Sequence, residues 1–480
     1  MSDDANAAHD TYDVIVIGAG PTGENVADRT AAAGLRTVIV ESELVGGECS
    51  YWACIPSKAL LRPAAALRAA RSVEGARQVA GERPVDAAAV LARRDSFVGD
   101  WRDDGQVSWL DSVGIELVRG HARLDGPRRV VVGERRLTAR HAVVVCTGSR
   151  AVVPELPGVA AARPWTSREA TAAKQVPGRL AIVGGGVVGA EMAAAWSSLG
   201  SRVTLLMRGE RPLPRMEPFA GDLVADGLRE AGVDVRPGVS VTGLSRGDGP
   251  VEVALDSGDS VTADEVLFAT GRAPRTDDLG LETVGLESGS WLDVDDTLRV
   301  TGVSDGWLYC VGDPNHRALL THQGKYQARI AGAAIAARAA GEPVDDTAWG
   351  PFAATADHAG VPQVVFTEPE VASVGLTAAA AEAAGRRYRV VDYDLGSVSG
   401  AALYADGYRG QARMVVDLDD ERLLGATFVG PGAGELLHAA TIAVTAQVPV
   451  SRLWHAVPAF PTVNEIWLRL LETYRDQPAA

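Results

Sequence analysis

The sequence has few cysteines, a deficit of basic residues and no long apolar run. Only four cysteines occur in 480 residues, which excludes the extracellular domains that rely on dense disulfide scaffolds. Lysine and arginine total 46 against 62 acidic residues, a net charge of −16, which argues against nucleic-acid or anionic-lipid partners. Apolar runs such as residues 180–190 reach only about half a membrane span, and Met1–Asp13 is acidic where a signal peptide is basic. We therefore expect a cytoplasmic protein without a membrane partner.

The chain is long and apolar enough for several domains. Of its residues 46% are apolar, so it can bury a large core, and at roughly 150 residues a domain its length fits about three domains. Two of the four cysteines, Cys49 and Cys54, lie five positions apart. In a reducing compartment such a pair indicates either redox chemistry or a metal site.

A strand–glycine–helix–strand pattern occurs twice. The apolar segments 14–17 and 180–183 each lead into glycines with the spacing G-x-G-x-x-G, then into a helical stretch and a second strand. From the first glycine to the end of the second strand both copies measure 23 positions. Such glycines allow close approach to a pyrophosphate at a helix N-terminus, so two dinucleotide-binding units are predicted. The glycines are Gly18, Gly20 and Gly23 in the first copy and Gly184, Gly186 and Gly189 in the second.

The two copies differ where the second strand ends. The first copy has Glu41 there, and a carboxylate at this position accepts hydrogen bonds from an adenosine ribose. The second copy has Met207 followed by Arg208, with Arg211 and Arg215 beyond. A guanidinium can hold a 2′-phosphate in a bidentate way, whereas a carboxylate would repel it. This half is therefore predicted to prefer NADPH to NADH; the alternative, that these arginines are solvated loop residues, stays open.

Matching strands and a change of pattern mark the rest of the chain. Residues 143–150 and 266–272 both read as a buried strand leading into a Thr-Gly turn, which supports the duplication. After Gly341 short strand patterns replace the repeats, so a third, α+β domain is predicted from about Gly350. Its predicted strands cover residues 364–367, 371–374, 389–393, 414–417 and 423–429, and its predicted helices cover residues 434–446 and 463–474.

The segment 46–61, G-G-E-C-S-Y-W-A-C-I-P-S-K-A-L-L, is the most specific stretch. A disulfide between Cys49 and Cys54 needs Cα atoms within about 7 Å, while five residues of straight helix advance about 7.5 Å. The chain should therefore bend between them, with a regular helix starting near Pro56. A thiolate there would be stabilised by the helix N-terminus and by Lys58. A zinc site would need further cysteine or histidine ligands at suitable spacing, and the neighbouring sequence has none.

Six ordered motifs resemble the FAD-dependent pyridine nucleotide–disulfide oxidoreductases, the group of glutathione reductase, dihydrolipoamide dehydrogenase and mercuric reductase. The motifs are G-A-G-P-T-G at 18–23, C-S-Y-W-A-C-I-P-S-K at 49–58, G-G-G-V-V-G-A-E at 184–191, A-T-G-R-A-P at 269–274, Y-C-V-G-D at 309–313 and F-T-E-P-E-V-A-S-V-G-L-T at 366–377. The resemblance covers nearly the whole chain. It implies an α/β fold with two Rossmann-like dinucleotide-binding domains and a C-terminal α+β dimerisation domain.

The resemblance also implies domain limits and an assembly. The FAD-binding domain is expected in two segments, 1–150 and 276–349, with an NAD(P)H-binding domain at 151–275 between them. The dimerisation domain is expected at 350–480. The active site would then be shared between the two subunits of a homodimer.

Individual roles follow from the same resemblance. Cys54 would face the flavin and Cys49 would attack the substrate, while Lys58, paired with Glu191, would lie near the flavin N5. Hydride would pass from NADPH to FAD and on to the Cys49–Cys54 disulfide, and the dithiol would reduce a small-molecule or protein disulfide by exchange. The residues expected to hold FAD are Gly18, Gly20, Gly23, Glu41, Ala122, Gly148 and Asp313. Those expected to hold the nicotinamide cofactor are Gly184, Gly186, Gly189, Arg208 and Gly271.

One motif of the family is changed. Its disulfide reductases end in H-P-T-x-x-E, whose histidine moves protons in thiol exchange, whereas this chain has Phe460 there and keeps Glu465, which we count among the catalytic residues. Three explanations stay open. The substrate needs no such base, as in mercuric reductase, although no cysteine follows Cys310 to supply that enzyme's C-terminal pair; His455 fills the gap; or the flavin passes electrons directly to a quinone or another small acceptor. A further alternative is a non-catalytic redox-sensing flavoprotein.

Other aromatic residues and cysteines are interpreted as structural. Tyr51 and Trp52, between the paired cysteines, are expected to pack against the protein rather than to shape a substrate site. Cys146 and Cys310 are expected to be buried and inert.

Overall fold

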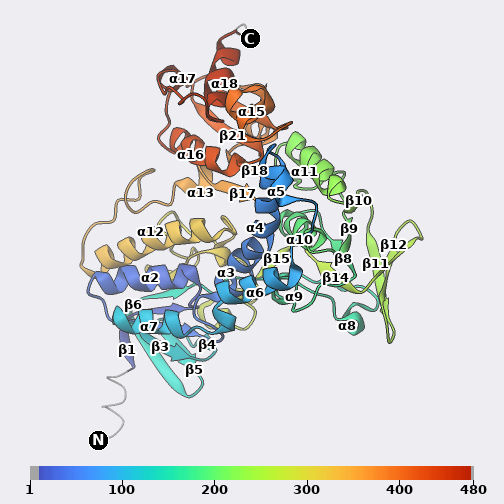
Figure 1. The fold of residues 1–480 in the computed structure, drawn as a ribbon. Helices are drawn as coiled ribbons and strands as arrows, with labels where there is room; N and C mark the ends of the chain where they lie inside the picture. The colour runs from blue at the N-terminus through green and yellow to red at the C-terminus, as the bar shows by residue number, and fades with distance from the viewer. Residues whose placement is uncertain (1–9, 477–480) are drawn as a thin grey trace, which may run out of the picture. The chain divides into compact units, whose positions relative to one another are not determined.

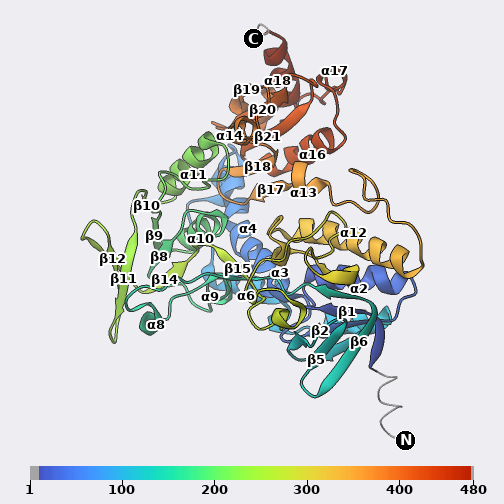
Figure 2. The same cartoon turned by 180° about the vertical axis from the view of Figure 1, so that it is seen from behind.

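The computed structural model describes residues 10–476, so most of the acidic segment Met1–Asp13 lies outside the described residues. The chain divides into two compact units (Figure 1, and from behind in Figure 2). Unit 1 consists of Met1–Pro56, Asp95–Val152 and Gly271–His358, and unit 2 of Ser57–Arg94, Val153–Thr270 and Ala359–Ala480. The four domain segments expected from the sequence stay a prediction.

Unit 1 is built on a seven-stranded sheet in the order β3-β2-β1-β6-β5-β4, with β16 also paired to β6. Strands β1, β2, β3, β6 and β16 run parallel, and β4 and β5 are antiparallel. On β1, Ile15 and Ile17 join one buried apolar cluster and Val14 and Val16 join another, because the central parallel strands are covered on both faces. The strands are β1 (Thr11–Ile17), β2 (Thr37–Glu41), β3 (Glu116–Arg119), β4 (Ala122–Leu124), β5 (Arg129–Val132), β6 (Arg135–Val145) and β16 (Leu308–Cys310).

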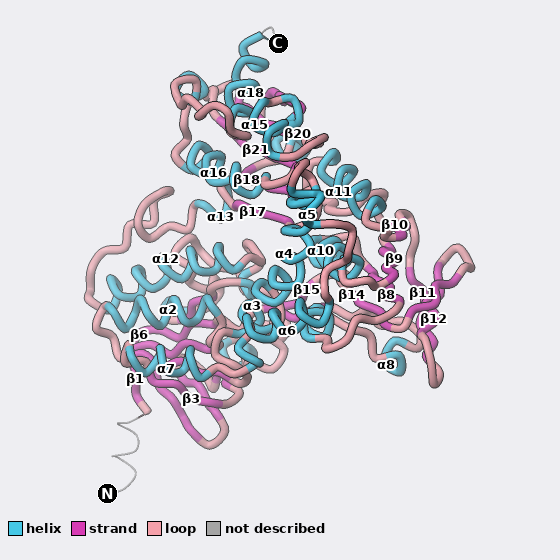
Figure 3. Tube along the Cα trace, in the orientation of Figure 1, coloured by secondary structure: helices cyan, strands magenta, loops and turns pink. Residues whose placement is uncertain are grey.

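Two long helices lie side by side over this sheet: α2 (Pro21–Ala32) and α12 (Thr321–Ala339) (Figures 1 and 3). A Cβ added at Gly324 would lie 2.5 Å from the Thr22 hydroxyl, and one added at Gly332 would lie 2.6 Å from Cβ of Arg29. Glycine at these two positions therefore lets the helices approach closely. Since Thr22 meets Gly324 and Arg29 meets Gly332, the helices run parallel and their N-termini lie at the same end.

Unit 2 contains the parallel sheet that carries the second glycine repeat. Its parallel strands have the order β10-β9-β8-β14, and a three-stranded antiparallel sheet, β11-β12-β13, is also present. The predicted second strand, 202–206, coincides with β9. The elements are β8 (Arg179–Val183), α10 (Val187–Ser198), β9 (Arg202–Leu206), α11 (Pro218–Glu230), β10 (Asp234–Arg236), β11 (Val241–Arg246), β12 (Val251–Leu255), β13 (Ser260–Ala263) and β14 (Glu265–Phe268).

Helix α4 (Cys54–Arg71) continues through Pro63. Proline has no N–H, so it leaves the carbonyl four residues earlier, that of Ala59, without its usual helical donor. Arg93 in α6 (Ala87–Phe97) donates a hydrogen bond to this carbonyl at 3.3 Å. The guanidinium thereby satisfies the acceptor that the proline leaves open.

The C-terminal part of unit 2 is an antiparallel sheet in the order β17-β18-β21-β20-β19. The five strands expected there are all present, with ends shifted by up to three residues. Helices α16 and α18 supply apolar side chains to its core, and Trp467 packs 5.5 Å from Phe428 between ring centroids. The elements are β17 (Pro362–Val365), β18 (Glu370–Gly375), β19 (Tyr388–Asp394), β20 (Gln411–Asp417), β21 (Leu423–Gly430), α16 (Leu437–Thr445) and α18 (Glu465–Asp476).

Short helices and strands complete the two units. They are α3 (Gly47–Tyr51), α5 (Ala76–Ala80), α7 (Asp104–Ser112), α8 (Val159–Ala162), α9 (Ser167–Ala172), α13 (Ala356–Ala359), α14 (Ala378–Ala383), α15 (Ser399–Tyr404), α17 (Val450–Leu453), β7 (Ser149–Ala151) and β15 (Arg272–Pro274). Within residues 10–476, no helix has both the length and the apolar character that crossing a membrane requires.

Candidate active site

The glycine turn of unit 1 is held by contacts between its own backbone atoms. Gly18 has φ +100°, and a Cβ there would lie 2.5 Å from the carbonyl oxygen of Cys146. A Cβ on Gly23 would lie 1.9 Å from the carbonyl oxygen of Gly18, whereas one on Gly20 would meet no heavy atom within 4 Å. The first and third glycines are required by the fold, and the middle one borders open space at the N-terminus of α2. A pyrophosphate fits such a cradle.

Unit 2 repeats the same arrangement. Gly184 has φ +120°, and its added Cβ would lie 2.3 Å from the carbonyl oxygen of Ala269. A Cβ on Gly189 would lie 1.9 Å from the Gly184 carbonyl oxygen, and one on Gly186 would again meet nothing within 4 Å. The two turns therefore share one steric design, as the internal repeat predicts.

Glu41 ends β2 and folds back onto the unit 1 turn. Its Oε2 accepts the N–H of Ala19 at 2.7 Å, and its Oε1 accepts the N–H of Glu43 at 2.8 Å. These bonds fix the carboxylate beside the cradle, where it can accept hydrogen bonds from a ribose.

Asp313 lies opposite the start of β7, at the end of the motif Y-C-V-G-D. Its carboxylate accepts a hydrogen bond from the Ser149 hydroxyl and lies 3.9 Å from Nε of Arg272. Burial raises the pKa of Asp313, while the Ser149 bond and the Arg272 charge lower it. Gly148, with φ +73°, comes directly before Ser149. These residues form one polar group in unit 1.

The other two expected cofactor residues also belong to unit 1. Ala122 is buried at the start of β4. Gly271 is the first residue of the third segment of unit 1, and its carbonyl accepts the N–H of Val152 at 3.0 Å. The prediction grouped Gly271 with the nicotinamide residues, and the other four of these lie in unit 2.

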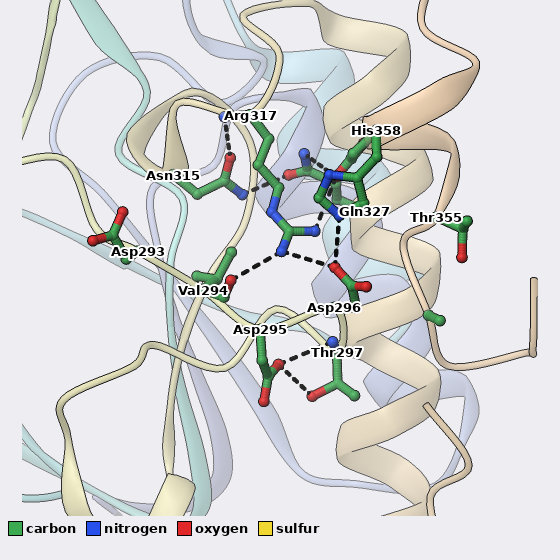
Figure 4. Close-up of polar contacts among 12 residues, drawn as sticks. Asp293, Val294, Asp295, Asp296, Thr297, Asn315, Arg317, Gln327, Thr355 and His358 are labelled. Carbon is green, nitrogen blue, oxygen red and sulfur yellow. Dashed lines mark hydrogen bonds and ion pairs between the residues drawn. The ribbon is translucent and has the colours of Figure 1, made fainter. Parts of the chain in front are cut away.

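A polar network braces the loop that follows β16. Gln327 on α12 accepts the N–H of Gly312 and a side-chain N–H of Asn315, both at 2.8 Å. Figure 4 shows Asn315 and Arg317 at this loop, with the Arg317 guanidinium 2.9 Å from Asp296. The network fixes the backbone next to Asp313 from the α12 side.

The two paired cysteines lie at a break between two helices. Helix α3 ends at Tyr51, Trp52 leaves the helical conformation with φ −137° and ψ −1°, and α4 begins at Cys54. The predicted bend is confirmed, but the helix starts two residues before Pro56. Proline is tolerated in a first turn because its N–H would have no helical partner there.

Thr321, which the sequence analysis missed, lies beside the cysteine pair. Its Oγ1 lies 3.2 Å from Sγ of Cys54. The pKa of Cys49 is raised by its hydrogen bond with Cys54 and by burial, and is lowered by Thr321 and by the charge of Lys325. The Cys49 thiol is therefore harder to deprotonate than a free thiol. The sequence signal for a helix start here was Leu-Leu-Thr at 319–321, where α12 begins. It does not point to Cys54, because 267 positions separate Thr321 from that cysteine.

Lys58 and Glu191 form the ion pair expected in unit 2. Nζ of Lys58 lies 2.7 Å from Oε2 of Glu191, a residue only 3% exposed on α10. The other oxygen of Glu191 accepts the N–H of Phe366 at 3.0 Å, and the ammonium lies 4.9 Å from the Phe366 ring centroid. The pair is held from two sides in a fixed geometry.

The arginines after β9 differ in their surroundings. Met207 is buried, with its sulfur against Gly185, and Arg208 is exposed. Arg211 already pairs with Asp222 at 2.9 Å. Arg208 is therefore better placed than Arg211 to bind an anion, and no carboxylate occupies the ribose position of this repeat.

The residues around the changed motif belong to unit 2. Phe460 is 74% exposed, and His455 is also exposed. Glu465 is buried at the start of α18, where it accepts a hydrogen bond from Arg469 at 2.6 Å and the N–H of Ser399 at 3.3 Å. The carboxylate of Glu465 is thus already hydrogen-bonded within unit 2.

The structural interpretations of nearby side chains agree with the geometry. Tyr51 is 1% exposed and donates to the carbonyls of Val45 and Arg102 at 3.0 and 3.3 Å, so it packs as expected. Cys146 and Cys310 are buried, and burial raises the pKa of both thiols.

Comparisons with known proteins agree with this geometry. Residues 12–340 match the family described as pyridine nucleotide-disulphide oxidoreductase, and residues 361–470 match its dimerisation domain. A dihydrolipoyl dehydrogenase from Thermus scotoductus is 34% identical, over 97% of this chain and 98% of that protein. A glutathione reductase from Burkholderia cepacia is 30% identical, over 96% and 98%.

Solved structures support the same assignment. The HOCl-induced flavoprotein disulfide reductase RclA from Escherichia coli has a TM-score of 0.81 and 26% identity, over 96% of this chain and 99% of that one. A structure of its Cu(II) complex has a TM-score of 0.81 and 25% identity, with the same coverage. The predicted α/β fold with two Rossmann-like domains and a dimerisation domain is confirmed. With a family match over most of its length, this chain belongs to the pyridine nucleotide-disulphide oxidoreductases and is an FAD-dependent flavoprotein of that family.

Proposed function

We propose that this chain is an NADPH-dependent disulfide reductase that works through Cys49 and Cys54. The observation that carries the proposal is the position of both cysteines at the break between α3 and α4, where Oγ1 of Thr321 lies 3.2 Å from Sγ of Cys54. FAD, when bound, takes hydride from the nicotinamide and supplies the electrons that open the Cys49–Cys54 disulfide. Every other part of the activity falls to side chains of this protein.

The cysteines have different tasks. Cys54 begins an 18-residue helix, whose N-terminal N–H groups stabilise a thiolate. Cys49 is the thiol that we assign to the attack on the substrate, the role that the family resemblance implies for it. Its thiolate would displace one sulfur of the substrate disulfide, and Cys54 would then displace the second and restore the protein disulfide. Both electrons come from the dithiol, and both substrate sulfurs leave as thiols after taking up the two protons.

NADPH is the proposed reductant because of the end of β9. Met207 removes the carboxylate that would repel a 2′-phosphate, and exposed Arg208 offers a guanidinium. The direct test is the ratio of kcat/KM for NADPH to that for NADH in Arg208→Glu. We expect the ratio to fall at least about tenfold, the effect of losing about 1.4 kcal/mol. An unchanged ratio would show that Arg208 plays no part in the choice.

The assembly and location are part of the proposal. The dimerisation domain supports a homodimer with an active site shared between subunits, and the expected domain limits would place residues 1–150 and 276–349 around FAD. We also propose a cytoplasmic location, in which the cysteines can cycle between disulfide and dithiol.

Phe460, which stands in place of the family's histidine, brings no proton-transfer group to such a site.

The deciding experiment is an anaerobic NADPH titration of the holoenzyme followed by its visible spectrum. A working dithiol takes up about twice the NADPH that the flavin alone requires, through a long-wavelength thiolate-to-flavin band that Cys54→Ser removes. In turnover assays, Cys49→Ser should abolish disulfide reduction and keep NADPH-driven dye reduction. Bleaching after one equivalent would instead indicate direct transfer to quinones or other acceptors, and no turnover with any acceptor would indicate a redox sensor.

A second candidate function is reduction of a soft metal ion at the same sulfurs. Phe460 favours it, since metal reduction releases no thiolate that needs a proton, and RclA has been crystallised as a Cu(II) complex. Thiolates select soft ions, and the two sulfurs would act as reductant rather than as a resident metal site, since residues 10–476 hold no cluster of three or more cysteine, histidine or acidic side chains arranged to bind a metal. Each dithiol would reduce two Cu(II) to Cu(I). NADPH oxidation with Cu(II) and a Cu(I) chelator, compared with a panel of disulfides, separates the two candidates.

A further inference from the structure

The loop that follows β9, residues 207–213, is anchored at both ends to the glycine turn of unit 2. A Cβ added at Gly185, within this turn, would lie 2.9 Å from the sulfur of Met207 and 3.4 Å from Cα of Pro212. The carbonyl of Gly185 also accepts the N–H of Leu213 at 2.8 Å. The loop therefore begins and ends on one residue of the predicted nucleotide cradle.

Leu213 makes the second anchor with a backbone conformation that leucine rarely adopts. Its φ is +56°, in the left-handed region that crowds a bulky residue, and it stands between Pro212 and Pro214. Neither proline has an N–H, so the N–H of Leu213 is the only backbone donor of this tripeptide, and it binds Gly185. The side chain of Leu213 is 3% exposed, within an apolar cluster of unit 2. Strain of this kind persists only where packing enforces it, and it is typical of segments that hold ligands.

Further contacts hold the loop between its two anchors. A Cβ added at Gly221 on α11 would lie 2.4 Å from the carbonyl oxygen of Pro212, so glycine lets α11 approach the loop closely. The carbonyl of Gly209 accepts the N–H of Gly238 at 3.2 Å. Arg208 stands directly before Gly209, and its side chain is exposed. The backbone that carries this guanidinium is therefore fixed by contacts within unit 2.

We propose that Leu213 is a positioning residue for cofactor selection: it locks the loop 207–213 on the glycine turn and so holds Arg208 at the ribose position of this repeat. This role rests on the proposed preference for NADPH and deepens it. A long side chain loses conformational freedom when it binds an anion, and a backbone that is fixed in advance keeps the total cost of ordering down. A looser loop would keep the arginine but discriminate less between a ribose with a 2′-phosphate and one without it.

The test is calorimetric titration of the oxidised holoenzyme with adenosine 2′,5′-bisphosphate and with adenosine 5′-monophosphate, which differ only in the 2′-phosphate. Wild type should bind the bisphosphate at least about tenfold more tightly. Leu213→Ala removes the packed side chain and keeps the strain, so this ratio of affinities should fall about threefold or more, the effect of ordering one long side chain, while binding of the monophosphate stays unchanged. Leu213→Met, with an apolar side chain of similar volume, should keep the ratio. Leu423→Ala, which removes another leucine only 3% exposed from β21, is the matched control and should also keep it.

The possible results separate the role of Leu213 from the preference for NADPH. Equal wild-type affinities for the two ligands would refute that preference, and this role with it. A high wild-type ratio that Leu213→Ala leaves unchanged overturns the role of Leu213 alone. Equal weakening of both ligands in Leu213→Ala also overturns it, because the loop would then support the whole nucleotide rather than the 2′-phosphate. If Leu213→Ala does not fold, Leu213→Gly replaces it: glycine adopts a φ of +56° without strain and keeps the N–H, so the ratio should fall there too, and an unchanged ratio overturns the role.

Discussion

The two glycine turns predict that neighbouring substitutions will separate folding from cofactor binding. An alanine Cβ at position 23 would lie 1.9 Å from the backbone oxygen of Gly18, more than 1 Å inside an ordinary contact, and neither atom belongs to a flexible side chain. We expect Gly23→Ala to lower the free energy of unfolding by about 3 kcal/mol. Gly20 has φ −70° and ψ 177°, which alanine adopts freely, and nothing within 4 Å of its added Cβ. Gly20→Ala should therefore change the stability of the apoprotein by less than about 1 kcal/mol.

The same methyl group at position 20 fills the space where the cradle faces outward. If a pyrophosphate lies there, Gly20→Ala should weaken FAD binding at least about tenfold, or about 1.4 kcal/mol. Urea unfolding of the apoprotein followed by far-UV circular dichroism gives the first quantity, and titration of apoprotein with FAD, followed by flavin fluorescence, gives the second. Normal FAD affinity in Gly20→Ala would refute the assignment of the cradle. Normal stability in Gly23→Ala would refute the steric account of the turn.

Three further predictions follow from unit 2 and from α2. Gly186→Ala, whose added Cβ also meets open space, should raise the Kd for NADPH and leave FAD content unchanged, as measured by cofactor titration and by absorbance. Arg413→Met should lower the free energy of unfolding by about 3 kcal/mol in urea unfolding. It removes the guanidinium that lies 2.9 Å from Glu217, a carboxylate only 2% exposed. Adding Glu217→Gln to this variant should recover part of the loss. Burial raises the pKa of Glu24 to about 7 in the folded state. The apoprotein should therefore lose up to about 3 kcal/mol of stability as the pH rises from 4.5 through 7. Unfolding curves at pH 5 and pH 8 measure this loss, which Glu24→Gln should abolish.

Local signals in the sequence were enough to predict the two repeats. Glycine spacing and short apolar strands are patterns among residues a few positions apart in the sequence. Residues 202–206 were therefore predicted correctly as a strand. The break between Cys49 and Cys54 also followed from local geometry, although α4 began earlier than Pro56 suggested. These features need no knowledge of distant parts of the chain.

The surroundings of the sulfurs could not be predicted in the same way. Thr321 reaches Cys54 because α12 packs on α2, and that packing depends on Gly324 and Gly332, whose role is visible only when the facing helix is known. Long-range packing places these groups, and no periodic pattern in the sequence records it.

The steric lock within each glycine turn has a consequence for how these proteins can be re-engineered. The first and third glycines constrain each other, while in our proposal the choice of nucleotide is made at the end of the following strand, by Glu41 in one copy and by Met207 and Arg208 in the other. Folding thus depends on the glycines of the motif, and the proposed choice of nucleotide depends on the residues at the end of the second strand. Cofactor preference should therefore be transplantable between reductases of this family by exchanging the few residues after β9, without redesign of the turn.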